Sequence, residues 1–191
     1  DEEGENLNVP LLGLPTENDW VLHGPYSDKS LMRNALAYWI SNQLGRYASR
    51  TRFCELLLNG SYHGVYVLME QVKRDPARVD IARVTGEDTE GDQVTGGYIL
   101  RIDRFAPGVD AGWYSRIAVE GQRLFYQFHY PRPEAISARQ MLYIRGFVHE
   151  FERVLGGAQF ADRETGYQRY IDTGSMIDYL IVNELAKNVD A

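Results

Sequence analysis

Apolar residues recur at helical spacing in one segment near the N-terminus. The residues of this stripe are Met32, Leu36, Trp39, Ile40 and Leu44. Ser27, Asp28 and Ser30 precede the stripe, and their side-chain oxygens can accept hydrogen bonds from the first N–H groups of a helix. Gly45 follows it, and glycine commonly ends a helix. The pattern therefore predicts a helix that starts at Ser27–Ser30 and stops at Gly45.

Two runs rich in β-branched and aromatic residues follow this helix. They cover residues 51–58 and 64–72, and the segment between them contains Asn59-Gly60, a dipeptide preferred in tight hairpin turns. Side chains alternate between the two faces of a strand, so Glu70 shares its face with Tyr66 and Leu68. We expect a hairpin with a carboxylate on an otherwise apolar and aromatic face.

Shorter patterns predict further strands and one loop. Asn6 to Leu14 is interpreted as one short strand, Tyr98 to Asp103 as another, and residues 113–130 as a hairpin that turns at Glu120-Gly121. Residues 85–92 are rich in carboxylates but lack the ligand spacing of a calcium-binding loop. We therefore expect a solvated surface loop there.

Two helices are predicted in the last third of the chain. The first carries the apolar stripe Ile136, Tyr143, Ile144, Phe147, Val148, Phe151 and Val154. It begins after Pro133 and ends at Gly156-Gly157. The second runs from Ser175 to Lys187 and is apolar around most of its circumference, which predicts burial on nearly all sides. Glu184 would then need a structural or functional partner, because an unpaired buried carboxylate is costly.

The order of the elements predicts an α+β fold. Residues 1–130 form a mainly β part with one helix, and residues 131–191 form the first helices of a helical part. The length suits one domain or two small lobes. We expect a single, truncated domain.

Composition excludes several classes of function. Twenty-seven acidic residues against 20 basic ones give a net charge of −7, which would repel a nucleic-acid backbone. The single cysteine, Cys54, excludes an internal disulfide, and the four histidines lack the spacing of a zinc site. No segment reaches the roughly 20 apolar residues that span a bilayer.

Common catalytic motifs, including the phosphate-binding loop and the zinc-protease helix, are absent. Four other segments occur in a specific order. They are Trp20-Val21-Leu22-His23-Gly24-Pro25-Tyr26-Ser27-Asp28-Lys29-Ser30-Leu31-Met32-Arg33-Asn34, Leu58 to Glu70 with its Asn-Gly-x-Tyr-x-Gly-Val-Tyr core, Gly96-Gly97-Tyr98-Ile99-Leu100, and Asn183-Glu184-Leu185 continuing to Asp190. In this order they resemble the signatures of the spore coat protein H (CotH) kinase family.

This resemblance implies an atypical, two-lobed kinase fold that binds ATP with Mg²⁺ or Mn²⁺ and phosphorylates protein serine. By position, Asp190 resembles the family's catalytic base, although its local sequence alone is typical of a solvated terminal residue. The resemblance also gives Asn188 and Asp190 as metal ligands. A secreted, cell-surface or spore-coat location is expected from it.

Cationic residues are needed in such a site to neutralise phosphate charge. Arg33 is a candidate ligand of the nucleotide, and a salt bridge to Asp28 is the alternative. Glu70 would orient a basic side chain on a phosphate, or else form an inter-strand ion pair. Lys73 is a third candidate, against an exposed cation at the end of a strand. Arg101 is the weakest of these and is expected to be a surface or ion-paired residue.

The chain also departs from the family pattern. Members continue to a Trp-Asp-x-Asp segment with a metal-binding aspartate and carry a Lys-rich strand upstream, and residues 1–191 include neither. We therefore expect this fragment to be inactive by itself.

A surface or coat binding module on a kinase-like scaffold is the alternative function. A glycoside hydrolase is a weaker third, since no carboxylate pair with suitable spacing is evident.

Overall fold

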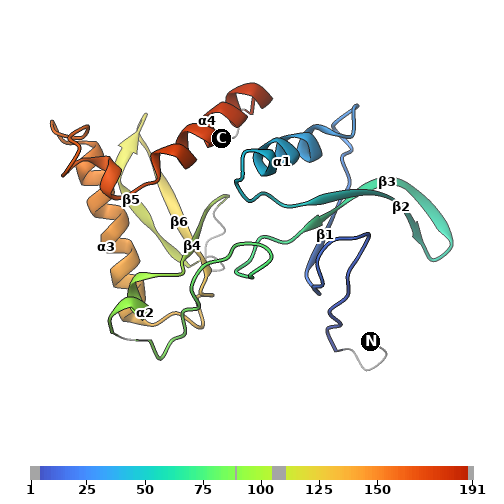
Figure 1. Cartoon of the computed structure of the whole chain (residues 1–191), viewed down its shortest axis with the longest axis horizontal. Coiled ribbons are helices and arrows are strands. Elements are labelled where there is room, and N and C mark those ends of the chain that lie inside the picture. The colour runs from blue at the N-terminus through green and yellow to red at the C-terminus, as the bar shows by residue number, and fades with distance from the viewer. Residues whose placement is uncertain (1–4, 89, 105–110, 189–191) are drawn as a thin grey trace. The chain divides into compact units, whose positions relative to one another are not determined.

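The computed structural model describes residues 5–88, 90–104 and 111–188, and these form a mixed α+β fold with two small antiparallel sheets (Figure 1). The α+β class predicted from the sequence is confirmed. The chain divides into two compact units: Asp1–Val72 with Gly174–Ala191, and Lys73–Thr173. The boundary predicted at residue 130 marks a different division, the change from a mainly β part to a helical part, and it stays a prediction. Among the described residues, no helix is both long and apolar enough to cross a bilayer.

The sheet of the first unit contains β1 (Trp20–His23), β2 (Thr51–Leu58) and β3 (Ser61–Glu70) in the order β1-β3-β2. The predicted hairpin is confirmed: Asn59 and Gly60 both have positive φ, as its tight turn requires. The predicted strand over residues 6–14 is wrong, since that segment forms only an isolated bridge from Val9 to Glu17. β1 was not predicted, because its four residues gain strand geometry only by pairing with the end of β3.

Helix α1 (Arg33–Gln43) starts later than its sequence predicts. Residues 27–32 form turns, in which Leu31 has a φ of +61°. The Asp28 carboxylate nevertheless accepts a hydrogen bond at 2.8 Å from the backbone N–H of Arg33, the first residue of the helix, and another at 3.0 Å from the Ser30 N–H in the preceding turn. Gly45, with a φ of +76°, ends the helix as predicted and allows the N–H of Arg46 to reach the Ser41 carbonyl at 3.1 Å.

Helix α4 (Thr173–Ala186) forms where it was predicted, but its predicted burial is wrong. The structure buries none of these 14 residues, and Leu185 is 66% exposed. Periodicity identified an apolar circumference but could not show whether other described elements cover it. Glu184 is exposed and can be hydrated, so it does not carry the free-energy cost of an unpaired buried carboxylate.

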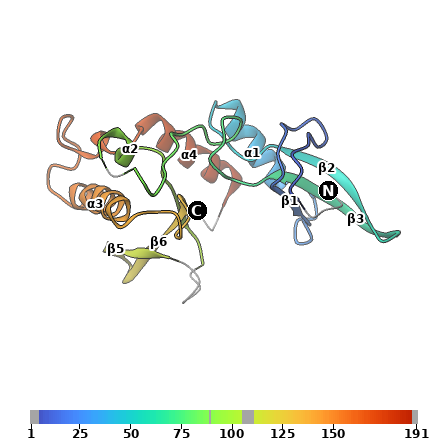
Figure 2. The same ribbon diagram turned by 90° about the horizontal axis from the view of Figure 1, so that it is seen from below.

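The second unit contains a sheet of β4 (Ile99–Ile102), β5 (Gly112–Val119) and β6 (Gln122–Tyr130), in the order β4-β6-β5. The short helix α2 (Asp92–Thr95) precedes this sheet, and α3 (Ala138–Leu155) and a 3-10 turn (Tyr167–Arg169) follow it. α3 contacts β5, and the two are seen together in Figure 2. The hairpin predicted over residues 113–130 and the helix after Pro133 are both confirmed.

Buried polar side chains connect α3 to its surroundings. The Glu152 carboxylate accepts hydrogen bonds from the backbone N–H of Arg116 at 3.0 Å and from the Tyr126 hydroxyl at 3.4 Å. Burial, with a smaller effect of this nearby carboxylate, raises the pKa of Tyr126 to about 12. Gln140 donates to the carbonyls of Thr85 and Asp88, so the polar loop over residues 85–92 is fastened to α3.

Two glycines of the second unit provide a matched test of this packing. A Cβ at Gly112 would collide with the backbone carbonyl of Tyr126 on the paired strand, whereas a Cβ at Gly146 in α3 would meet nothing within 4 Å. We predict that Gly112→Ala lowers the free energy of unfolding by more than about 1 kcal/mol, while Gly146→Ala raises it by up to about 1 kcal/mol. Urea denaturation measures both, and equal effects would contradict the strand pairing.

Candidate functional site

A cavity of about 670 Å³ lies in the first unit between α1 and α4. The two helices run in opposite directions (Figure 1), so the start of α1 and the end of α4 lie toward the same end of the cavity. Arg33 and Asn34 contribute there from α1, and Lys187 and Asn188 from the residues after α4. The structure therefore places two sequence-predicted site residues, Arg33 and Asn188, in the lining of one cavity.

The lining carries more positive than negative charge. Among the described residues, the lining contains the three cationic side chains of Arg33, Arg46 and Lys187 and one carboxylate, that of Asp178. The resulting formal charge of +2 contrasts with −7 for the whole chain. A partly enclosed cavity with this balance favours an anionic ligand.

Arg33 makes the salt bridge to Asp28 that was the alternative to a ligand role. Its Nε lies 3.4 Å from Asp28 Oδ1, and its side chain is 81% exposed. The hydrogen bond from the Arg33 backbone N–H, together with those of Ser30, holds the pKa of Asp28 below its usual value. Such an exposed pair is weak, and an anion in the cavity can compete with Asp28 for the guanidinium.

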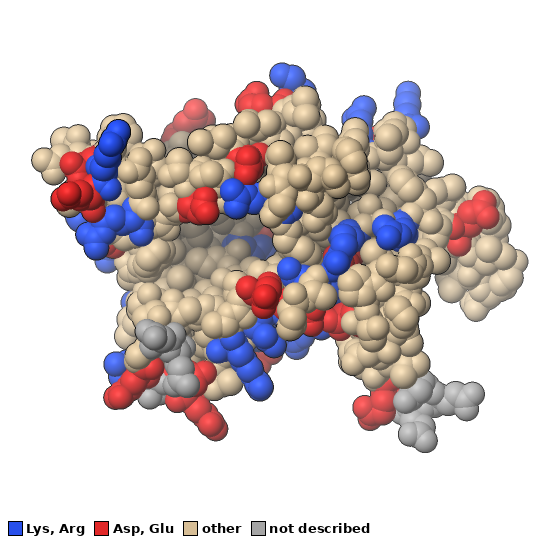
Figure 3. Space-filling model, viewed as in Figure 1, with Lys and Arg blue, Asp and Glu red and all other residues tan. Residues whose placement is uncertain are grey.

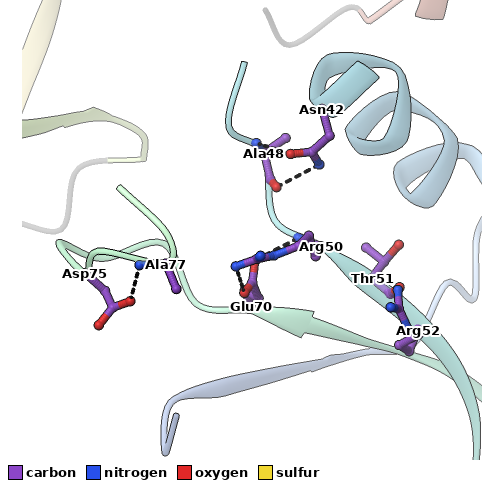
Figure 4. A network of polar contacts seen from close by, with 8 residues as sticks. All are labelled: Asn42, Ala48, Arg50, Thr51, Arg52, Glu70, Asp75 and Ala77. Atoms are coloured by element: carbon purple, nitrogen blue, oxygen red, sulfur yellow. Dashed lines mark hydrogen bonds and ion pairs between the residues drawn. The ribbon is translucent and has the colours of Figure 1, made fainter. Parts of the chain in front are cut away.

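Glu70 forms a buried ion pair with Arg50 (Figure 4). Arg50 donates from Nε to Oε2 at 2.9 Å and from Nη2 to Oε1 at 2.6 Å, and its backbone N–H also donates to Oε2 at 3.0 Å. The Glu70 side chain is fully buried, whereas that of Arg50 is 36% exposed. The carboxylate thus connects the end of β3 to the residue before β2, which is the inter-strand pair left open by the sequence.

The loop over residues 44–50 joins α1 to β2 and is held by side chains along its length. Asn42 Nδ2 donates to the carbonyls of Tyr38 and Ala48, each at 2.9 Å, and Asn42 Oδ1 accepts from the Ala48 N–H at 3.3 Å. Figure 4 shows the contact between Asn42 and Ala48. On α4, Asp178 Oδ2 accepts from Arg46 Nε at 2.8 Å. Sequence reasoning missed Asn42, Arg46, Arg50 and Asp178.

Lys73 and Arg101 belong to the second unit. Lys73 is partly exposed just after β3, and its carbonyl accepts from the Val79 N–H at 3.3 Å. Arg101 Nε donates at 2.7 Å to the side-chain oxygen of Gln127, which is buried in the sheet. Arg101 is exposed as expected, and its partner in this hydrogen bond is the neutral side-chain amide of Gln127.

The family resemblance implied two metal ligands, Asn188 and Asp190, and the structure describes the first of them. Asp190 lies outside the described residues. Asn188 closes the end of α4, since its Nδ2 donates to Asn183 Oδ1 at 2.8 Å and its N–H donates to the Asn183 carbonyl at 3.1 Å. Within residues 5–88, 90–104 and 111–188, no group of three or more His, Cys, Asp and Glu side chains could hold a metal ion.

The family model described as CotH kinase protein matches residues 1–191, which is the whole chain. No curated protein and no solved structure matches it significantly.

The Arg50–Glu70 pair can be tested by removing the cation. Arg50→Met leaves a fully buried carboxylate without its counter-charge, and we predict a loss of about 3 kcal/mol in the free energy of unfolding. This is the lower part of the usual range, because Arg50 is itself partly exposed. Arg153→Met, which removes an exposed pair with Glu150, is the control and should leave unfolding unchanged. Equal denaturation midpoints for the two variants would contradict this role of Glu70.

Proposed function

The chain belongs to the CotH kinase family, and we propose that it forms part of an ATP-dependent protein serine kinase whose site includes the cavity between α1 and α4. The observation that carries this proposal is the excess of cationic side chains around the cavity, at the helix end that leads to Asp190. Phosphoryl transfer depends mainly on neutralised phosphate charge and an oriented acceptor. The cavity supports the first need and Asp190 would serve the second.

The size and charge of the cavity suit a nucleotide. Small-molecule sites commonly enclose about 300–1,000 Å³, and about 670 Å³ lies within that range. Arg33 and Lys187 would hold phosphate oxygens through charge-assisted hydrogen bonds. Glu70 would contribute indirectly by fixing Arg50 and the loop that follows α1. Lys73 stays a predicted phosphate contact.

Asp190 would act as the general base of the transfer. Its carboxylate would accept the proton of the substrate serine as the serine oxygen bonds to the γ-phosphorus and the bond to ADP breaks. Mg²⁺ or Mn²⁺ would supply charge neutralisation for the phosphates, with Asn188 and Asp190 as its ligands in this chain. The partner is then a protein that offers a serine hydroxyl.

A binding module on the same scaffold is the second candidate function, and one observation favours it. The far end of the β2–β3 hairpin exposes large apolar side chains, among them Leu57 (64% exposed), Leu58 and Tyr62. Figure 3 shows few charged side chains on this end of the hairpin. Such exposed apolar groups are typical of contact surfaces. ATP binding distinguishes the two functions.

The proposal is tested on the protein with any sequence that flanks residues 1–191 in it. We predict that millimolar ATP with Mg²⁺ or Mn²⁺ raises the melting temperature, because a ligand that binds only the folded state stabilises it, by about 2.7 kcal/mol at 100 times Kd. Arg33→Met should reduce this shift. Asp190→Ala removes one of the two proposed metal ligands and should retain part of the shift, but it should lower radiolabelled phosphate transfer to a serine substrate by about 10²–10⁴-fold.

Asp80→Ala, an exposed carboxylate of the second unit, is the matched control and should leave both readouts unchanged. If ATP produces no thermal shift, the binding module is favoured over the kinase. Equal phosphate transfer by wild type and Asp190→Ala would remove Asp190 from the catalytic role.

A further inference from the structure

We propose that Arg46 and Asp178 are positioning residues, whose ion pair fixes the direction of α4 and thereby the place of its C-terminal end beside the cavity. This inference rests on the proposed function, because that end carries Asn188 and leads to Asp190. Neither Arg46 nor Asp178 needs to touch the substrate for this role.

The exposure of α4 makes a polar attachment necessary. Its residues that line the cavity recur at helical spacing and are Ser175, Asp178, Tyr179, Val182, Asn183 and Ala186. The structure buries none of the described residues of this helix, and Ile181 and Leu185 are more than half exposed. Apolar burial is the usual force that fixes a helix on its neighbours. Here that force is weak, so a directional bond has a larger share in setting the helix direction.

The Arg46–Asp178 pair provides such a bond. Arg46 Nε lies 2.8 Å from Asp178 Oδ2, and the two side chains are 38% and 25% exposed. Partial burial lowers the screening by solvent, so the attraction is stronger than in a fully exposed pair. The bond joins Arg46, in the loop that follows α1, to Asp178 in the second turn of α4.

The Arg46 end of the pair is itself fixed. The Arg46 N–H donates to the Ser41 carbonyl at 3.1 Å, and Ser41 Oγ donates to the Arg46 carbonyl at 3.3 Å. Further along the same loop, Asn42 holds Ala48, and Arg50 holds Glu70 of β3. Asp178 is thus attached to a point that is anchored both to α1 and to the sheet.

The geometry of a helix converts this attachment into control of the site. Eight positions separate Asp178 from Ala186, the last residue of α4, which corresponds to about 12 Å of helix at about 1.5 Å per residue. A tilt of about 10° at Asp178 would therefore move this end of the helix by about 2 Å. Misplacement of a catalytic group by about 1 Å can lower a rate about 100-fold. Loss of the pair should therefore slow phosphoryl transfer more strongly than it weakens ATP binding, to which Lys187 at the same helix end would contribute.

Steady-state kinetics of two single variants test this. Arg46→Met and Asp178→Asn should each lower kcat by about 10–100-fold and, because the same helix end carries Lys187, both should raise the KM for ATP by a smaller factor. The exchanged double variant, Arg46→Asp with Asp178→Arg, should recover at least about tenfold of the lost kcat. Arg153→Met, which removes an exposed ion pair of the second unit, should behave as wild type.

A direct role of Arg46 as a phosphate ligand would give a different result. Arg46→Met would then raise the KM for ATP, whereas Asp178→Asn would lower it by releasing the guanidinium. Opposite shifts of KM in the two variants would overturn the positioning role. If Arg46→Met does not fold, Asp178→Asn and the exchanged variant decide the question between them.

Hydrogen exchange gives a readout that does not depend on activity. The backbone amides of residues 177–186 should exchange at least about tenfold faster in both single variants than in wild type or Arg153→Met, because α4 has lost its attachment. Unchanged exchange in both would overturn the inference. If wild type transfers no phosphate, the proposed function has failed, and the catalytic part of this inference fails with it. The exchange rates still decide whether the pair attaches α4.

Discussion

The buried carboxylate of Glu70 imposes the constraint on which the first unit depends. A fully buried charge must be paired and hydrogen-bonded, or folding would lose several kcal/mol. Arg50 meets this requirement with three N–H groups, two from its guanidinium and one from its backbone. Because the backbone takes part, the pair fixes the chain as well as the side chain, and it sets where the loop after α1 must enter β2.

The rest of the candidate site follows from that fixed loop. With Arg50 attached to β3 and Asn42 attached to Ala48, the loop has little freedom, and Arg46 projects from it to Asp178. The two helices then enclose a cavity with a local positive charge in an acidic chain. Proteins commonly use such local departures from net charge to attract ligands of the opposite sign. The structural ion pairs and the cation-lined cavity are therefore parts of one arrangement.

Local patterns in the sequence were enough to predict the elements that local forces determine. The Asn59-Gly60 turn, the hairpin at Glu120-Gly121 and the helices ending at Gly45 and Gly156 all depend on a few adjacent residues, and all are present. β1 was missed because its pairing partner lies more than 40 residues away. Element types were thus predictable where their cause was local.

The site was less predictable for the same reason. Arg46 and Asp178 are separated by 132 positions, and no residue type near either one indicates the other. Glu70 was recognised as unusual from the face it occupies, but its partner could not be named, because Arg50 has no special sequence context. The apolar circumference of α4 predicted burial, and periodicity could not reveal that described neighbours leave it exposed.

Asn42 has a consequence for the chemical ageing of the protein. Its amide nitrogen donates to two carbonyl oxygens, and its amide oxygen accepts from an N–H. Deamidation would replace that nitrogen with a negatively charged oxygen of nearly the same size, which would face the carbonyls of Tyr38 and Ala48 and repel both. A change of one atom would then loosen the loop that carries Arg46 and Arg50. The effect would extend to α4, because that loop carries Arg46, the partner of Asp178.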